Sequence, residues 1–476
     1  MKRFLMLVLL SSAVAAVSGE IRLPRLVGDN MVLQQQSEVK IWGWSEPSER
    51  IKVTASWRAE AKTVADSEGR WQVTVATPEA SFTPYEITVE GNRSGKVGFG
   101  NVLVGEVWLC SGQSNMAMLM KGYPGSPVEG YNLFAQECRQ FGAIRQFNVA
   151  RRSSFEPLDD VEGSWQVTSP EVISTFSATP YLFARELYMS LNVPIGIINS
   201  SWGGSVIEAW MSSESQQQFS DVGLSREAVE AIPQENHRPV IIYNAMLLPL
   251  TNYVIKGFCW YQGCSNVERY PTYADKMVSM IGLWRELWHN SELPFYYVEI
   301  CPYNSRDPQA IGSALLREQQ AEVMTRVANT GMVVTNDLVY PYEADNIHPR
   351  QKAAVAKRLA CWALSRDYGW GEGLHTIGPR YRSVEFAKGK AVVHFDGVDN
   401  GFGSQGEISG FEIAGPDSVF YPATVSRAKF RDKFLTVWND SVTEPVAVRY
   451  CFRNFLQGNL FDVYGMPTVP FRTDDF

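Results

Sequence analysis

The chain has 476 residues, of which 45% are hydrophobic, 20% charged and 12% aromatic. This composition is typical of an ordered globular protein and excludes disordered, collagen-like and coiled-coil chains. At about 150 residues per domain, the length predicts two or three domains, each able to bury its own core. The formal net charge is −8. The chain therefore has no basic surplus to neutralise phosphates, and we expect no nucleic acid partner.

The amino-terminal residues have the pattern of a secretory signal. Lys2 and Arg3 form a positive n-region, and the apolar stretch 4–17 ends in small residues. We expect cleavage near 18–20, so that residues 1–19 form a signal peptide. The apolar run is short for a hydrocarbon core of about 30 Å, and no later stretch approaches about 18 uninterrupted apolar residues. The sequence predicts an exported protein, periplasmic or secreted, without stable membrane association.

The cysteines and histidines do not form the pattern of a metal site. The seven cysteines are irregularly spaced and include no CxxC pair, which argues against a disulfide framework or a zinc site. Cys110, Cys259 and Cys301 lie in apolar, strand-like runs, so we expect most cysteines to be core residues rather than bridges. HExxH is absent, and no two of the five histidines lie within five residues of each other. We expect neither a metal nor a cofactor.

Hydrophobic periodicity divides the rest of the chain into three regions. Residues 20–100 contain short alternating strands separated by turn residues, which predict an N-terminal β-sandwich domain, and the four glycines of 91–100 predict a linker. Residues 101–372 alternate continuous apolar runs with helical patterns, which predicts an α/β domain with a largely parallel sheet. Residues 373–476 return to strand patterns and form a C-terminal β-rich region. The strands expected in the first region are 39–44, 51–55, 71–75 and 85–89; the apolar runs of the second are 103–110, 194–199, 256–261, 293–300 and 332–335, with helices at 179–189, 273–288 and 349–366.

Four short motifs follow these apolar runs, and each one alone is weak evidence for a catalytic site. Ser114 lies in a small-residue turn after 107–110, where a serine is usually only a capping residue. Gly204 and Asn266 lie at two further strand-to-loop corners and are suitable hydrogen-bond donors for an oxyanion, although such corners are more often plain turns. Because the carboxyl ends of parallel strands share one edge of the sheet, we expect the ligand site there.

The fourth motif is Asp345-Asn-Ile-His-Pro349. Pro349 fits the first position of the helix that follows, which would place His348 at a helix amino end, where the dipole favours a neutral imidazole. Asp345 can reach back to the imidazole N–H and hold its tautomer. A capping aspartate beside an exposed histidine is the commoner interpretation of this motif alone.

Taken together, the four motifs resemble the SGNH hydrolase superfamily, in its sialate O-acetylesterase-like branch of carbohydrate esterases. The matching segments are VWLCSGQSNM (107–116), INSSWGGSVIEAWM (198–211), WYQGCSN (260–266) and DNIHP (345–349), and the opening segment 26–49 also looks like the β domain of this family. The resemblance implies a flavodoxin-like three-layer domain between the two β-rich regions. It makes Ser114 the nucleophile, His348 the base and Asp345 the residue that orients it. The N–H of Ser114, with Gly204 and Asn266, would form the oxyanion hole. One departure is Cys264, where this branch usually has Glu.

The resemblance further implies a serine esterase that removes O-acetyl groups from sugars, either sialic acids or plant polysaccharides. Because an unperturbed imidazole has a pKa of ~6.5, we expect the activity to fall on the acid side as His348 protonates. The tryptophans at the motif corners are either sugar-stacking or core residues. Two alternatives stay open: a lipid or thioester hydrolase using the same residues, and an inactive carbohydrate-binding protein. The candidate substrate contacts are Gln113, Trp202, Tyr261, Gln262 and Arg269, with Tyr123, Tyr340 and Tyr342 as further loop residues near the motifs.

Overall fold

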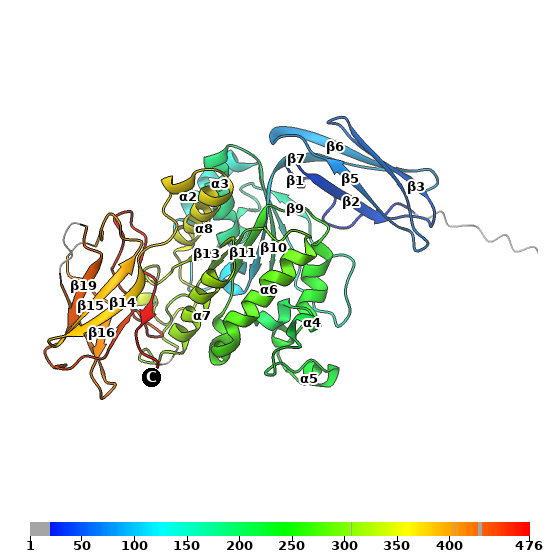
Figure 1. Ribbon diagram of the computed structural model, residues 1–476. Helices are drawn as coiled ribbons and strands as arrows, with labels where there is room; N and C mark the ends of the chain where they lie inside the picture. The colour runs from blue at the N-terminus through cyan, green and yellow to red at the C-terminus, as the bar shows by residue number, and fades with distance from the viewer. Residues whose placement is uncertain (1–19, 306, 405, 427–430) are drawn as a thin grey trace, which may run out of the picture.

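Three regions follow one another along the molecule in chain order (Figure 1). The structure, a computed structural model, describes residues 20–305, 307–404, 406–426 and 431–476. The expected signal peptide, residues 1–19, lies outside the described residues. Within the described residues, no helix combines the length and the apolar character needed to cross a bilayer.

The N-terminal region is a β-sandwich, as its alternating patterns predict. Strands β2 and β5 pair antiparallel and face a second sheet built on β3, β4, β6 and the first half of β7. The alternating apolar residues, such as Ile41, Val53 and Val73, are buried in the core, while their polar neighbours face outward. The strands of this region are β1 (Val32–Gln34), β2 (Glu38–Trp44), β3 (Arg50–Ala55), β4 (Ala59–Val64), β5 (Arg70–Ala76) and β6 (Ser81–Gly91).

The linker predicted at 91–100 is wrong, because these residues form the tip of a hairpin and the start of a long strand. β6 ends at Gly91 and β7 (Gly95–Gly112) begins four residues later. Gly91 is required by a close approach: a Cβ there would lie 2.4 Å from the Glu49 carboxylate, which accepts hydrogen bonds from the turn at 93–94. The first half of β7 pairs with β6 and its second half with the central sheet. A single strand therefore crosses the expected domain boundary at 100/101.

The central sheet has the strand order β13-β12-β11-β7-β10-β8-β9. All pairs in it are parallel except β8 with β9, which lies at the edge. Four of the five apolar runs predicted from the sequence form the inner strands β7, β10, β11 and β12, and the fifth, 332–335, overlaps the edge strand β13. Every residue of β11 and β12 is buried. The strands that join β7 in this sheet are β8 (Ile144–Asn148), β9 (Trp165–Val167), β10 (Ile195–Ser201), β11 (Gly257–Tyr261), β12 (Phe295–Val298) and β13 (Thr330–Val333).

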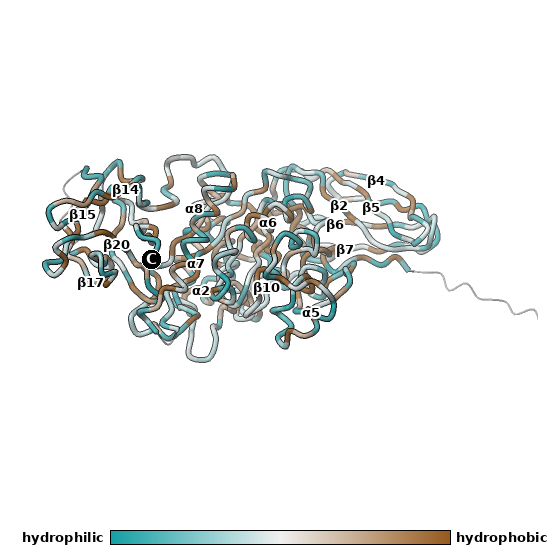
Figure 2. The backbone as a smooth tube through the Cα atoms, turned by 60° about the horizontal axis from the view of Figure 1, so that its bottom comes forward, coloured by the Kyte–Doolittle hydropathy of each residue, from teal (hydrophilic) through white to brown (hydrophobic). Residues whose placement is uncertain are grey.

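Helices cover both faces of this sheet and complete the three layers. The core that includes Trp108 and Tyr296 packs against α3 and α8, and the core that includes Phe258 and Trp260 packs against α6 and α7. Figure 2 shows hydrophobic residues along the segments of this central region. The predicted α/β fold with a largely parallel sheet is confirmed. Its helices are α1 (Ser114–Ala117), α2 (Tyr131–Glu137), α3 (Ala178–Leu191), α4 (Ser213–Gln216), α5 (Arg226–Glu230), α6 (Tyr273–Leu287), α7 (Gly312–Arg326) and α8 (Lys352–Asp367).

The C-terminal region is a second β-sandwich. Two four-stranded antiparallel sheets, β14-β15-β19-β18 and β17-β16-β20-β21, share a core that includes Val393, Leu435 and Ile413. Figure 1 places this region beside α7, at the end of the molecule opposite to β2 and β3. Its strands are β14 (Arg380–Ala387), β15 (Lys390–Asp396), β16 (Phe411–Ala414), β17 (Phe420–Pro422), β18 (Thr424–Val425), β19 (Phe434–Trp438), β20 (Ala447–Tyr450) and β21 (Phe471–Arg472).

All seven cysteines are free thiols. Cys110, Cys259 and Cys301 are buried, as their apolar surroundings predict. Cys138 and Cys451 are also buried, and Cys264 and Cys361 are half-buried.

Candidate active site

Ser114 lies at the carboxyl end of β7, the strand at the centre of the sheet. β7 ends at Gly112, and Ser114 is the first residue of α1. Gly112 has a φ of +134°, and a Cβ there would lie 2.3 Å from the carbonyl oxygen of Tyr261, so the turn has no room for a side chain. Within the described chain, the N–H of Ser114 has no hydrogen-bond acceptor. The corner therefore presents a half-buried hydroxyl next to an unpaired amide.

The next corner follows β10, which pairs with β7. The N–H of Trp202 donates to the Gly112 carbonyl at 3.0 Å, which holds the two corners together. Gly203 lies against the nucleophile candidate, since a Cβ there would be 3.4 Å from the Cβ of Ser114. Gly204 has a φ of +75°, and among the described residues its N–H has no acceptor. Its carbonyl accepts from the Ser265 hydroxyl at 2.8 Å, so the corner is tied to the loop after β11.

The third corner follows β11, on the other side of β7. Asn266 lies in the 3-10 helix η7 (Cys264–Thr272) and is 1% exposed. Its Oδ1 accepts from the Ile207 N–H at 3.0 Å and from Gln262 Nε2 at 2.7 Å, while its Nδ2 donates to Glu208 Oε2 at 2.9 Å. These bonds fix the orientation of the amide and leave its second Nδ2 hydrogen free. Because Ser201 and Tyr261 are both in register with Gly112, the three corners meet at one edge of the sheet.

His348 comes to the same edge from the loop before α8. Its ring packs edge-on against Tyr123 with centroids 4.9 Å apart, and the Tyr123 hydroxyl donates to the Ser114 carbonyl at 3.3 Å. Asn115 Nδ2 donates to the Ile347 carbonyl at 3.0 Å. The residue that follows Ser114 thus contacts the residue that precedes His348. The structure therefore brings the serine and the histidine to one site.

The predicted place of His348 in its helix is wrong. α8 begins at Lys352, and Pro349 lies three residues before it in irregular backbone. The Arg350 N–H and Nε both donate to Glu343 Oε1, at 3.3 and 3.1 Å, which holds this segment in the loop. The helix dipole argument for a neutral imidazole therefore does not apply. Instead, burial and then the nearby Lys352 ammonium lower the pKa of His348 to about 4.

Asp345 does not contact the imidazole. Its carboxylate is exposed, and its Oδ1 accepts from Asn304 Nδ2 at 2.7 Å. Among the described residues, no hydrogen bond or ion pair joins Asp345 to His348. Nε2 of His348 is buried and also has no hydrogen-bond partner within the described chain.

Comparisons with known proteins identify the family of this chain. Residues 104–364 match the model of the family described as carbohydrate esterase, sialic acid-specific acetylesterase. The sialate O-acetylesterase of Homo sapiens is 30% identical over 412 residues, which cover 78% of this chain and 76% of that protein. The chain belongs to this family of carbohydrate esterases.

Two further relatives extend the likeness of this esterase beyond the catalytic region. The sialate O-acetylesterase of Mus musculus is 28% identical over 434 residues, which cover 78% of each chain. A crystal structure of a carbohydrate acetylesterase from Xanthomonas citri matches with a TM-score of 0.85 and 33% identity, covering 96% of this chain and 100% of that one. The esterase is therefore a carboxylic ester hydrolase, and its three-region architecture has a close structural counterpart.

Of the predicted substrate contacts in the esterase, three are part of the scaffold. Gln113, Tyr261 and Gln262 are 3%, 1% and 0% exposed. Gln113 Oε1 accepts from the Gly263 N–H at 2.8 Å, and Gln262 Nε2 donates to Asn266 and to the Ser205 carbonyl. Burial makes these residues supports for the corners rather than surfaces for a substrate.

The other two predicted contacts reach solvent. Trp202 is half-buried, next to Gly203. The Arg269 side chain is 38% exposed, and its Nη2 lies 3.4 Å from Glu208 Oε2. The remaining tryptophans of the motifs, Trp108, Trp210 and Trp260, are fully buried core residues.

Charged groups that were not predicted from the sequence lie behind the corners. Glu208 and Lys276 form a buried ion pair at 2.9 Å, with side chains 1% and 0% exposed, and Lys276 also pairs with Asp221. Glu208 lies inside the quoted motif 198–211, which was the available signal for it. Lys276 lies within the predicted helix 273–288, where a charged residue is expected to be exposed.

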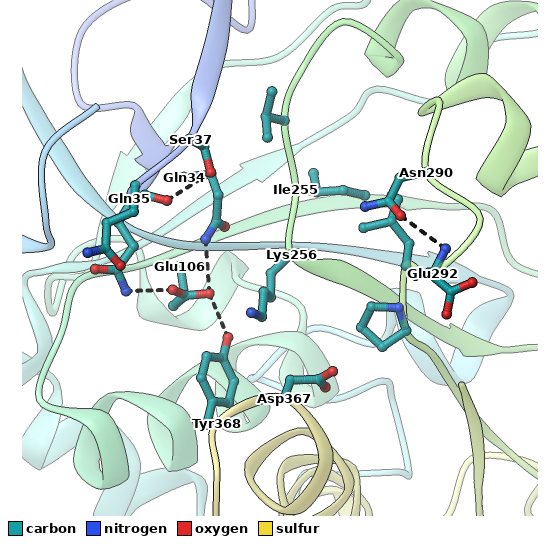
Figure 3. Close-up of a pocket in the computed structure, with 14 residues that line it drawn as sticks. Gln34, Gln35, Ser37, Glu106, Ile255, Lys256, Asn290, Glu292, Asp367 and Tyr368 are labelled. Atoms are coloured by element: carbon teal, nitrogen blue, oxygen red, sulfur yellow. Dashed lines mark hydrogen bonds between the residues drawn. The ribbon is translucent and has the colours of Figure 1, made fainter. Parts of the chain in front are cut away.

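A prominent cavity of the esterase lies elsewhere. It has a volume of about 580 Å³ and is lined by Glu106, Lys256 and Tyr368, among others (Figure 3). Glu106 precedes the part of β7 that pairs with β11, and Lys256 precedes the first residue of β11. The cavity therefore lies at the amino ends of the strands, opposite to the edge with Ser114. Within the described residues, no group of three or more His, Cys, Asp or Glu side chains is placed to hold a metal ion.

Proposed function

We propose that this chain is a serine esterase that removes acetyl groups from O-acetylated carbohydrates through an acetyl-serine intermediate. The observation that carries the proposal is the meeting of Ser114 and His348 at one edge of the sheet, through Tyr123 and Asn115. The names of the similar proteins, sialate O-acetylesterases and a carbohydrate acetylesterase, support the substrate class.

In the first step, Ser114 Oγ attacks the carbonyl carbon of the ester while His348 accepts the hydroxyl proton. The nitrogen proposed to accept this proton is Nε2, which is buried and unpaired within the described chain. The C–O bond to the sugar then breaks, and the imidazolium returns its proton to the departing sugar oxygen, which leaves as a hydroxyl. Water hydrolyses the acetyl-serine by the same steps in reverse order.

The negative charge of the tetrahedral intermediate is proposed to be held by three donors. They are the free N–H groups of Ser114 and Gly204 and the second Nδ2 hydrogen of Asn266. One donor of this kind typically contributes about 2.7–4 kcal/mol to the transition state. All three come from corners that are already held by internal hydrogen bonds, so little reorganisation is needed during the reaction.

Asp345 stays the proposed partner of the imidazole, with a smaller contribution than that of Ser114 or His348. Its carboxylate contacts Asn304 in this structure, and catalytic hydrogen bonds often shorten only when the substrate is bound. The packing of Tyr123 against His348 supplies part of the ring orientation without Asp345.

The test is acetate release from a panel of O-acetylated sialosides and plant polysaccharides, measured for the wild-type chain and for Ser114→Ala and His348→Ala. Both variants are expected to fall to background while their circular dichroism spectra stay native. Turnover by Ser114→Ala near the wild-type rate would remove the proposal. A chain-length series of nitrophenyl esters accompanies the panel, and activity should be lost beyond acetyl or propionyl. Preference for long acyl chains would instead indicate a lipid or thioester hydrolase.

We further propose that the chain is exported to the periplasm or secreted. The support is the charged and apolar pattern of residues 1–19, which resembles a cleaved signal. Amino-terminal sequencing of the mature protein from its source cells tests this, with a new terminus expected near 18–20. A mature protein that begins at Met1 would contradict it.

A further inference from the structure

Lys352 is a buried cation beside the proposed base. It is the first residue of α8 and is 0% exposed. Within the described residues its ammonium forms no ion pair with a carboxylate. Nζ donates to Asn115 Oδ1 at 2.6 Å and lies 5.7 Å from the centroid of the Tyr261 ring. A buried charge without an opposite charge is costly, so its retention needs a reason.

The hydrogen bonds of Asn115 connect Lys352 to both proposed catalytic residues. Asn115 is 1% exposed and directly follows Ser114. Its Nδ2 donates at 3.0 Å to the carbonyl of Ile347, which directly precedes His348. The ammonium is a pure donor and the carbonyl is a pure acceptor, so together they allow only one orientation of the amide between them. Lys352 thus fixes the side chain that ties the His348 loop to the Ser114 corner.

The groups around Lys352 leave its charge largely uncompensated. The thiols of Cys264 and Cys301 and the carboxylate of Glu343 act on it, but burial outweighs them and lowers the pKa of Lys352 to about 8. Burial likewise raises the pKa of both thiols, so they stay neutral at physiological pH. Glu343 instead pairs with Arg350 at 3.1 Å. The ammonium therefore stays positive at acid and neutral pH and opposes a second positive charge on His348.

We propose that Lys352 is a positioning residue of the esterase, which holds the Asn115 bridge between the Ser114 corner and the His348 loop and whose charge adds to burial in keeping the imidazole neutral. This inference rests on the proposed roles of Ser114 and His348. It assigns two separable effects to one side chain. The bridge supports the rate, and the charge adds to burial in setting the acid limit of activity.

Three variants separate the two effects. Lys352→Met removes the charge and the bridge, and should lower kcat about tenfold and move the acid limb of kcat/KM to higher pH by about one pH unit. Asn115→Ala removes the bridge and should lower kcat. Cys264→Glu places a carboxylate beside the ammonium and keeps the bridge, and should move the acid limb upward with kcat near wild type.

The control is Lys357→Met, which removes an exposed lysine from the same helix and should change neither quantity. Thermal unfolding accompanies each variant. If Lys352→Met does not fold, Cys264→Glu and Asn115→Ala still decide the question. Acid limbs that stay at the wild-type position in both Lys352→Met and Cys264→Glu, or an Asn115→Ala variant with wild-type kcat, would overturn the inference. Such results would leave the proposed function intact as long as Ser114→Ala is inactive, so the two failures are distinguishable.

Discussion

Replacing Glu208 by glutamine tests whether a buried ion pair orients the third oxyanion donor. Glu208 accepts from Asn266 Nδ2 and from Lys276 Nζ, both at 2.9 Å, and its side chain is 1% exposed. The substitution keeps the size of the side chain and removes its charge. Among the described residues, Lys276, which is 0% exposed, then retains only Asp221 as an anionic partner, and Asn266 loses the carboxylate that anchors its Nδ2.

The expected magnitudes follow from these contacts. Removal of one partner of a buried ion pair costs about 3–5 kcal/mol, and we expect about 3 kcal/mol in the free energy of unfolding because Asp221 stays. Complete loss of an oxyanion donor typically costs about 100- to 1,000-fold in kcat. Since Glu208→Gln leaves the Asn266 amide in place with one anchor weakened, kcat should fall by about 10- to 100-fold. KM should change less than about threefold, because the donor acts mainly on the transition state.

The assay is steady-state hydrolysis of a short acetyl ester, with Glu214→Gln as the control. Glu214 is an exposed residue of the neighbouring α4, and its substitution should leave kcat unchanged. The decisive measurement is the double variant with Asn266→Ala. If Glu208 acts through Asn266, the double variant should be no slower than Asn266→Ala alone. A further tenfold loss in the double variant, or a wild-type kcat in Glu208→Gln, would refute the reasoning.

Three further outcomes are expected. Burial and Lys352 lower the pKa of His348 to about 4, so the imidazole stays neutral at mildly acid pH. We therefore expect kcat/KM to be lost only as the pH falls through about 4. A pH profile of kcat/KM with its acid midpoint between pH 6 and 7 would contradict this. Asp345→Asn should lower kcat less than about tenfold, because the exposed carboxylate contacts Asn304 rather than the imidazole, and a loss as large as that of His348→Ala would contradict the structure. Tyr342 is 71% exposed and stacks on Tyr340 in the loop that carries His348. Tyr342→Ala should therefore raise KM for acetylated polysaccharide, while KM for a small nitrophenyl ester and the thermal midpoint stay unchanged. Equal effects on both substrates would argue against a sugar contact there.

The parts of the site that could be predicted are those that depend on a few residues close together in the sequence. Ser114, Gly204 and Asn266 each follow a continuous apolar run, and such runs identify strands whose carboxyl ends share an edge. The turns at these corners need few residues, so their chemistry is visible in the motif itself. The expectations about His348 were less accurate. Pro349 is a common helix-start signal, but the two bonds from Arg350 to Glu343 keep 349–351 in the loop, and the helix begins at Lys352.

The features that could not be predicted from the sequence depend on contacts between residues that are distant along the chain. Lys276 and Lys352 are buried, whereas lysines are almost always exposed, so no pattern marks them. The glycines of 91–100 have the composition of a linker. Gly91 is instead required by the close approach of Glu49, which is 42 residues away in the chain. Composition alone does not distinguish a flexible segment from a crowded hairpin.

The path of β7 limits how this enzyme can be engineered. One uninterrupted strand of 18 residues begins in the N-terminal sandwich and ends two residues before Ser114. A truncation at residue 100 would cut this strand in two and remove the pairing of β6 with β7. The catalytic region therefore cannot be separated from the N-terminal region at that residue. A substitution in the first half of β7, within the sandwich, changes the same strand that leads into the turn with Ser114. Shortened or fused forms of the enzyme should therefore keep residues 20–112 as one piece.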